Sequence, residues 1–174
     1  MKNLNCKNKL AFSLLETIVV LFIISIGLVS ILSLTVDSTR AQNLNKNSLV
    51  AYNLAAEGLE LIKNVRDTNF IQNSTSTPIS WDRYIVEGTY RTDWATFQPV
   101  AVGNISEAKL QLSTGAYTNL YWHKSGDQDS IFSRLITTKY TSVNSLQVSS
   151  LVEWTDQGQT YQVELKSMLY DWTY

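Results

Sequence analysis

The chain has 174 residues, of which 44% are hydrophobic and 17% charged, so it holds one modest folded domain plus whatever its ends carry. Its 14 basic and 15 acidic residues leave a net charge of −1, and no basic surplus is available to hold a nucleic-acid backbone by charge alone. The single cysteine excludes an intramolecular disulfide and a cysteine-based zinc site, and the single histidine argues against a histidine-based metal site.

An apolar run from Thr17 to Val36 is the first element in chain order, and its 20 residues include no Asp, Glu, Lys or Arg. At about 1.5 Å per residue, a helix over this run is roughly 30 Å long, which is the thickness of a bilayer core. The upstream segment 1–11 carries Lys2, Lys7 and Lys9 and no acidic residue, and this predicts a cytoplasmic N-terminus. The sequence therefore predicts a single-pass protein of the cytoplasmic membrane with its C-terminal part outside the cytoplasm.

Glu16 lies at the start of this apolar stretch. Insertion scales give a carboxylate at membrane depth a cost of about 2.5–3.5 kcal/mol, and the cost falls near a helix end. One interpretation is therefore a tolerated interfacial glutamate. We favour the other interpretation, in which Glu16 has a partner cation.

The segment from Lys9 to Glu16, KLAFSLLE, followed by the apolar run, resembles the processing site of type IV prepilins and pseudopilins. The resemblance implies that prepilin peptidase cleaves between Ala11 and Phe12, and that Phe12 becomes the N-methylated terminus. It also implies that Glu16 is the glutamate retained at the fifth position of the mature chain. Glu16 would pair with the terminal amine of a neighbouring subunit, so that neither charge stays unpaired among apolar helices and the helix register is fixed.

Two departures from the family pattern bear on this resemblance. The family usually has glycine where this chain has Ala11. Major pilins often carry a proline within the apolar run, and this chain has none there. The second departure favours a minor pilin or pseudopilin over a major subunit.

Beyond Val36 the apolar residues recur at helical spacing among charged residues, which predicts an amphipathic helix. No proline precedes Pro78, so we expect one continuous helix from about Phe12 to Phe70, roughly 88 Å long. The predicted organisation is a leader peptide (1–11), a transmembrane or filament-core helix (12–36), an amphipathic helix half (37–70) and a β-rich globular head (71–174).

The head is predicted to consist of short strands. The clearest signal is alternation of apolar and polar residues over 146–154 and 161–169, on either side of the turn Asp156-Gln157-Gly158, which predicts a long antiparallel hairpin. The fold class is therefore α+β, a long N-terminal helix with an antiparallel β-sheet packed on its second half. Weaker strand signals lie at 84–86, 108–112 and 131–140.

Three features of the head are candidate binding sites. Asp127 and Asp129 lie in a glycine-containing turn and offer oxygen ligands of the kind Ca²⁺ prefers, but no third acid is near, so we favour an ordinary polar turn and predict no metal and no cofactor. His123 beside them is predicted to be structural or exposed. The tryptophans could form an adhesive, glycan-stacking or nucleic-acid-stacking surface, but core filling is favoured, above all for Trp154. All five lie in the head: Trp81, Trp94, Trp122, Trp154 and Trp172.

No enzyme motif is present, neither GxSxG nor a phosphate loop nor HExxH, so no catalytic residue is assigned and the chain is not expected to be an enzyme. The resemblance implies a structural subunit of a type IV pilus-like or a type II secretion or competence pseudopilus-like filament, at the cell surface after assembly. The implied partners are other pilin or pseudopilin subunits, prepilin peptidase, a membrane platform with its cytoplasmic assembly ATPase, and membrane lipid before assembly. The alternative is a single-pass, membrane-anchored extracellular binding domain that does not polymerise.

Overall fold

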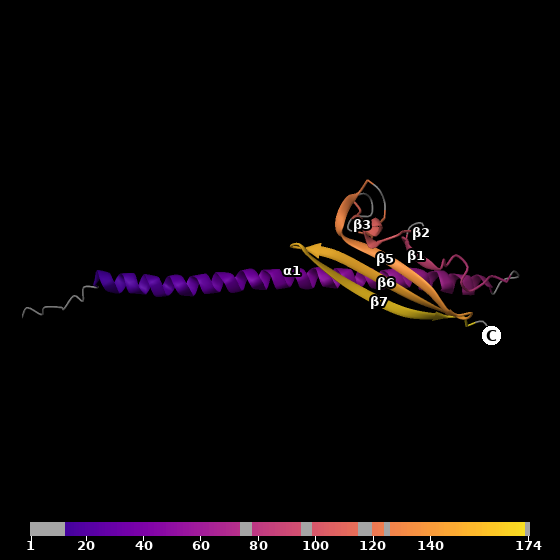
Figure 1. Ribbon diagram of the computed structural model, residues 1–174, viewed down its shortest axis with the longest axis horizontal. Coiled ribbons are helices and arrows are strands. Elements are labelled where there is room, and N and C mark those ends of the chain that lie inside the picture. The colour runs from indigo at the N-terminus through magenta and orange to yellow at the C-terminus, as the bar shows by residue number, and fades with distance from the viewer. Residues whose placement is uncertain (1–12, 74–77, 95–98, 115–119, 124–125, 173–174) are drawn as a thin grey trace, which may run out of the picture. The chain divides into compact units, whose positions relative to one another are not determined.

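The computed structural model describes residues 13–73, 78–94, 99–114, 120–123 and 126–172 (Figure 1). One helix, α1 (Leu14–Asn73), is followed by an antiparallel sheet, which confirms the α+β class. The chain divides into two compact units, Met1–Leu44 and Asn45–Tyr174, and each is described by itself.

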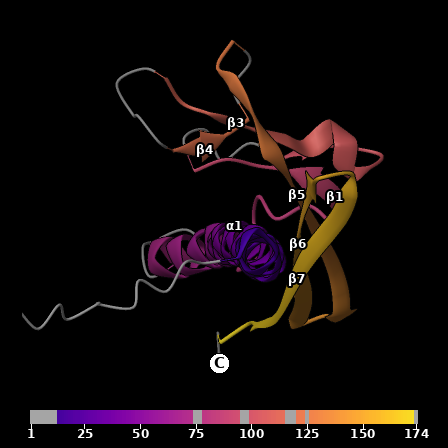
Figure 2. The same ribbon diagram turned by 90° about the vertical axis from the view of Figure 1, so that its left-hand side faces the viewer.

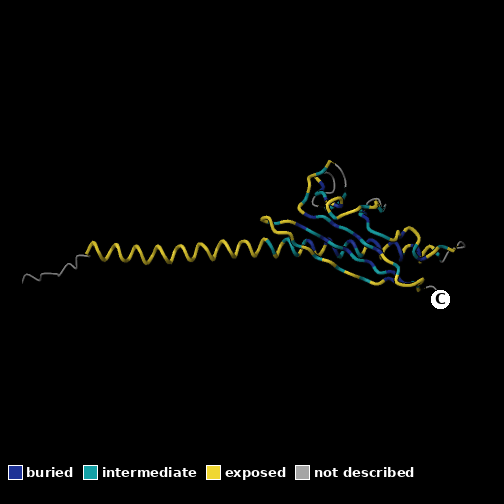
Figure 3. Tube along the Cα trace, in the orientation of Figure 1, coloured by how far each residue is buried: buried dark blue, intermediate teal, exposed yellow. Residues whose placement is uncertain are grey.

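In the first unit, α1 begins where the backbone N–H groups of Glu16 and Thr17 donate to the carbonyl of Ser13, at 3.0 and 3.2 Å. Every described residue of this unit up to Asn43 is exposed (Figure 3). Among the described residues, α1 is long and apolar enough, by length and composition, to cross a membrane.

The second unit, here called the head, contains the last part of α1 and the sheet. Strands β5, β6 and β7 form an antiparallel meander. On its other side β5 pairs with β1 and β3, while β2 pairs with β1 and β4 with β3, which gives a 7-stranded sheet. The strands are β1 (Gly88–Arg91), β2 (Val100–Ala101), β3 (Lys109–Leu112), β4 (Tyr121–Trp122), β5 (Gln128–Ser142), β6 (Ser145–Asp156) and β7 (Gln159–Tyr170), and a 3₁₀ helix, η1 (Ile105–Ala108), precedes β3.

The predicted hairpin is confirmed as β6 and β7, which pair from Ser145 opposite Tyr170 to Asp156 opposite Gln159. Gln157 and Gly158 form the turn with φ values of 50° and 79°. Two consecutive positive φ values define a two-residue type I′ turn, whose twist matches that of the strands it joins. Glycine supplies the second of these conformations without steric strain.

The core of the head lies between α1 and one face of the sheet, as the magenta part of α1 against β5, β6 and β7 shows (Figure 2). The buried residues of α1 in the head recur with helical spacing and therefore form one stripe, which faces the strands. The opposite stripe of the helix stays in solvent. Two adjoining apolar clusters fill the space. The first contains Ile62, Val65, Trp81, Ile85, Tyr90, Ile136, Leu146, Val148 and Leu169, and the second contains Ala51, Leu54, Ala55, Leu110, Phe132, Val152 and Trp154.

The strand predicted at 84–86 is wrong. Residues 81–84 form a turn, and Tyr84 has a φ of 70°, outside the β region. The side-chain amide of Asn69 on α1 donates to the carbonyls of Trp81 and Arg83, at 3.1 and 2.6 Å. These carbonyls are therefore satisfied by a helix side chain and not by a neighbouring strand, and the first strand forms only at Gly88.

The other strand predictions needed smaller changes. The strand expected at 108–112 begins at Lys109 because Ala108 ends η1, and the strand expected at 131–140 extends to Gln128–Ser142. The short strands β1, β2 and β4 were not predicted. Each has four residues or fewer, too few for an alternation of apolar and polar residues to be recognised.

At Gly58 the helix α1 lies close against the sheet, and this contact leads to a stability prediction. A Cβ at this position would collide with Oγ of Ser150 and lie 3.2 Å from both Cβ of Ser150 and Cδ of Arg134. We expect Gly58→Ala to destabilise the head by about 1–3 kcal/mol through overpacking, although alanine is the better helix former. Thermal unfolding of the full chain, followed by near-ultraviolet circular dichroism of the tryptophans, measures this.

Gly27→Ala is the matched control, because a Cβ there meets nothing within 4 Å. It should leave the unfolding of the head unchanged. Adding Ser150→Ala to Gly58→Ala should recover part of the loss. An increase in stability on Gly58→Ala alone would contradict the close approach.

Candidate functional site

Glu16 lies in the first turn of α1 and is exposed, between the equally exposed Leu15 and Thr17. Within the described residues no cation forms an ion pair with its carboxylate, and the next charged residue along the helix is Asp37. A cation that pairs with Glu16 would thus come from outside the described part of this chain. Ala11 and Phe12, at which cleavage and methylation are expected, lie outside the described residues.

The helix surface that follows Glu16 is apolar on every side. Large aliphatic and aromatic side chains from Ile18 to Val36 are about half exposed or more. A continuous apolar surface of this length is unfavourable in water and marks a surface meant for lipid or for other apolar helices.

Several hydroxyl groups within the apolar run are satisfied by their own helix. The hydroxyls of Ser25, Ser30 and Thr35 each donate to the carbonyl four residues earlier, at distances of 2.7, 3.0 and 2.9 Å. An unsatisfied hydroxyl would be costly away from water, and this local bonding removes that cost. Glu16 is therefore the polar side chain at the start of the run whose charge still needs a partner.

In the head, the tryptophans divide into buried and exposed groups. Trp81 and Trp154 are buried, at 7% and 3% exposure, as expected for core residues. For Trp94 and Trp172 the core prediction is wrong, since they are 40% and 54% exposed. Trp94 stacks on the half-buried Trp122 with ring centroids 6.2 Å apart and an interplanar angle of 8°.

Asp127 and Asp129 each face protein donors. The carboxylate of Asp127 accepts from Nε1 of Trp122 at 2.8 Å and from the hydroxyl of Thr114 at 3.1 Å. Asp129 lies inside β5 and accepts from Lys109 and Gln111, and these hydrogen bonds lower its pKa. Among the described residues no group of three or more His, Cys, Asp and Glu side chains is arranged to hold a metal ion.

His123 is structural. Its side chain is 3% exposed, and its ring nitrogens lie 2.8 Å from Oδ1 of Asp93 and 3.2 Å from the carbonyl oxygen of Ala108. Burial raises the pKa of the Asp93 carboxyl, but the hydrogen bonds and charge of His123 and the charge of Arg134 together hold that pKa below its usual value. The pair joins the segment after β1 to the segment after β4.

Arg134 was missed by sequence reasoning, although it lies within a predicted strand. Its side chain is 0% exposed. The guanidinium donates to the carbonyl oxygens of Leu54 on α1, at 3.3 Å, and of Thr92 after β1, at 3.2 Å, and lies 3.1 Å from a carboxylate oxygen of Glu57. A signal was present, because Arg134 shares the inward face of β5 with Phe132 and is the charged residue on an otherwise apolar or hydroxyl-bearing face.

Comparison with known proteins bears on the helix and not on the head. Residues 6–32 match the family model described as the prokaryotic N-terminal methylation motif. The match confirms the resemblance of this segment to prepilin-type N-termini, and it includes Ala11, Phe12 and Glu16. No curated protein and no solved structure matches the chain.

Arg134 generates the second prediction. Replacing it by methionine keeps much of the volume but leaves the buried carbonyl of Thr92 without its donor, so we expect Arg134→Met to destabilise the head by about 1–3 kcal/mol. Arg134→Lys should be intermediate, because an ammonium cannot reach three acceptors with the fixed geometry of a guanidinium. Urea unfolding followed by tryptophan fluorescence measures both.

Lys139→Met is the matched control, since it removes the same charge from an exposed position on the same strand. It should change the free energy of unfolding by less than about 0.5 kcal/mol. Equal effects of the two methionine variants would show that the buried contacts of Arg134 contribute nothing specific.

Proposed function

We propose that this chain, which carries a prepilin-type N-terminal methylation motif, is the precursor of a structural subunit of a type IV pilus-like or a type II secretion or competence pseudopilus-like filament. The observation that carries the proposal is Glu16 directly before the charge-free run Thr17 to Val36 of α1, whose apolar side chains are exposed on all sides. Prepilin peptidase would remove Met1 to Ala11 and leave an N-methylated Phe12.

The proposed assembly step exchanges one apolar environment for another. In the membrane the side chains from Thr17 to Val36 contact lipid, and in the filament they would contact the same segments of neighbouring subunits. The apolar surface therefore gains little from the exchange and allows it in either direction. Glu16 would favour the filament over the membrane and would set the stagger between neighbouring subunits. Its carboxylate would meet the terminal amine of a neighbour where neither charge is well solvated.

The other proposed partners follow from processing and assembly. The precursor would stay in the cytoplasmic membrane with its head outside the cytoplasm, and would be handled by the peptidase, a membrane platform and a cytoplasmic assembly ATPase. Removal of Lys2, Lys7 and Lys9 would leave 11 basic and 15 acidic residues, a net charge of −4. A mature chain of that charge is a poor match to DNA held by bulk electrostatics.

Processing is tested at the N-terminus. We expect intact-mass and peptide mass spectrometry of the natively expressed protein to find a chain that begins at N-methylated Phe12, both in membranes and in sheared surface filaments. Ala11→Gly should process at least as completely, because glycine is the usual residue of the family, and Ala11→Lys should block processing. A chain that begins at Met1 and stays in membranes would favour the alternative of an anchored, non-polymerising binding domain.

Assembly is tested at Glu16. Glu16→Ala removes the proposed partner of the terminal amine, so the protein should stay in membranes while its amount in sheared filaments falls at least about tenfold, as expected for loss of a poorly solvated ion pair. Immunoblots of the two fractions measure this. Glu60→Ala is the matched control, an exposed acid on the same helix whose surface pair with Lys63, at 3.3 Å, should contribute little. Equal amounts of Glu16→Ala and wild-type protein in filaments would reject the assembly role.

A further inference from the structure

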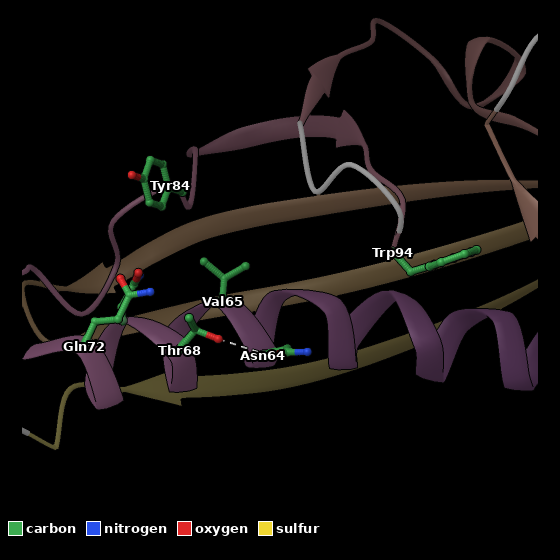
Figure 4. A pocket seen from close by; sticks show the side chains of 7 residues that line it. Asn64, Val65, Thr68, Gln72, Tyr84 and Trp94 are labelled. Atoms are coloured by element: carbon green, nitrogen blue, oxygen red, sulfur yellow. Dashed lines mark hydrogen bonds between the residues drawn. The ribbon is translucent and has the colours of Figure 1, made fainter.

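A groove in the head lies between α1 and the turn that precedes β1. Its volume is about 290 Å³, at the lower end of the range of about 300–1,000 Å³ that is typical of small-molecule sites. Val65 projects from α1 between two aromatic side chains, Tyr84 and Trp94 (Figure 4). Asn64 and Thr68 lie beside it on the same helix. The groove thus combines an apolar floor with aromatic rings and neutral polar groups.

The backbone holds Tyr84 in an unfavourable conformation that keeps its ring in solvent. A φ of 70° is an outlier for a bulky residue and places its backbone under strain. The turn is fixed by Asn69, itself 2% exposed, through its two hydrogen bonds to the carbonyls of Trp81 and Arg83. Tyr84 as a residue is nevertheless 62% exposed, with the guanidinium of Arg83 4.7 Å from the centroid of its ring. Strain kept for an exposed aromatic ring points to a function of that ring.

The second ring of the groove is also held in place. Trp94 stacks on Trp122, and Nε1 of Trp122 donates to the carboxylate of Asp127 at 2.8 Å. A ligand that meets Tyr84 and Trp94 therefore finds two aromatic surfaces that lose little conformational freedom on binding.

The polar groups of the groove form a neutral donor and acceptor pair. Thr68 Oγ1 donates to Oδ1 of Asn64 at 3.3 Å, so the amide nitrogen of Asn64 remains a donor and the Thr68 oxygen remains an acceptor, one helical turn apart. The charged neighbours on the helix pair with other residues, Lys63 with Glu60 at 3.3 Å and Asp67 with Arg66 at 2.6 Å. The described lining of the groove carries no formal charge.

We propose that this groove binds a short neutral saccharide. A sugar ring presents an apolar face of C–H groups to an aromatic ring and hydroxyls at its edge, and two neighbouring hydroxyls match the donor and acceptor of Asn64 and Thr68. The lining residues themselves offer an anionic ligand no counter-charge, and the adjacent guanidinium of Arg83 already lies over the ring of Tyr84. The inference does not rest on filament assembly, because the groove lies wholly within the head.

The experiment measures binding to the purified full chain in nanodiscs, because detergents with sugar headgroups would compete for the groove. The probes are chitotriose, maltotriose and cellotriose, with sialyllactose as the anionic comparison, followed by isothermal titration calorimetry. We expect at least one neutral probe to bind with a Kd below about 1 mM and sialyllactose to bind more weakly.

Tyr84→Asn is the decisive variant, because asparagine adopts a positive φ readily and removes the ring without straining the turn. It should weaken binding about tenfold, Tyr84→Phe should retain it, and Asn64→Ala should weaken it. Tyr52→Ala is the matched control, an exposed tyrosine on α1 outside the groove, and should bind as wild type. Failure of all three neutral probes to bind, tighter binding of sialyllactose, or unchanged binding by Tyr84→Asn would overturn the proposal. None of these outcomes alters the test of Glu16 in filaments.

Discussion

One uninterrupted helix must satisfy two different environments, and the rest of the chain is arranged around that constraint. From Leu14 to Asn73 the backbone of α1 stays helical, while its side chains change from apolar on all sides to apolar along one buried stripe. The first pattern suits lipid or other apolar helices, and the second needs a folded partner from the same chain. The sheet supplies that partner, and the hydroxyls of Ser25, Ser30 and Thr35 in the first part bond to carbonyls of the helix itself.

Within the head, the helix lies so close to the sheet that small residues are needed at the contact. Beside this contact, one buried arginine side chain fills a larger space. Ala51, Ala55 and Gly58 face the strands, and Ser150 takes up the space opposite Gly58. Arg134 fills the neighbouring volume and joins α1, β5 and the end of β1 through backbone carbonyls. Its charge is offset by Glu57, which keeps contact with solvent, so the cation is buried without being left unpaired. The same packing fixes Asn69 and the turn that carries Tyr84.

Sequence reasoning succeeded where a single local rule decides the structure. The hairpin of β6 and β7 follows from alternation and from Gln157-Gly158, and the helix from its apolar spacing and the absence of proline. Sequence reasoning failed where a side chain distant in the sequence determines the local structure. Residues 84–86 are of types that favour a strand, but the side-chain amide of Asn69 binds the carbonyls of Trp81 and Arg83 just before them and holds a turn there. Glu16 was found through a motif, whereas the groove could not be, because Asn64 and Trp94 meet only in the folded head.

The two proposed sites, Glu16 and the groove in the head, differ in the part that charge plays in each. In the proposed filament Glu16 would act where solvation is poor, so its single carboxylate would dominate its surroundings. The groove is open to water and has an uncharged described lining, so its selectivity would come from ring stacking and from the pattern of donors and acceptors. A net negative mature chain repels anions at long range but is indifferent to a neutral sugar. If both proposals hold, the head could change its ligand through residues such as Tyr84 and Asn64 while α1 keeps the sequence that the proposed assembly requires.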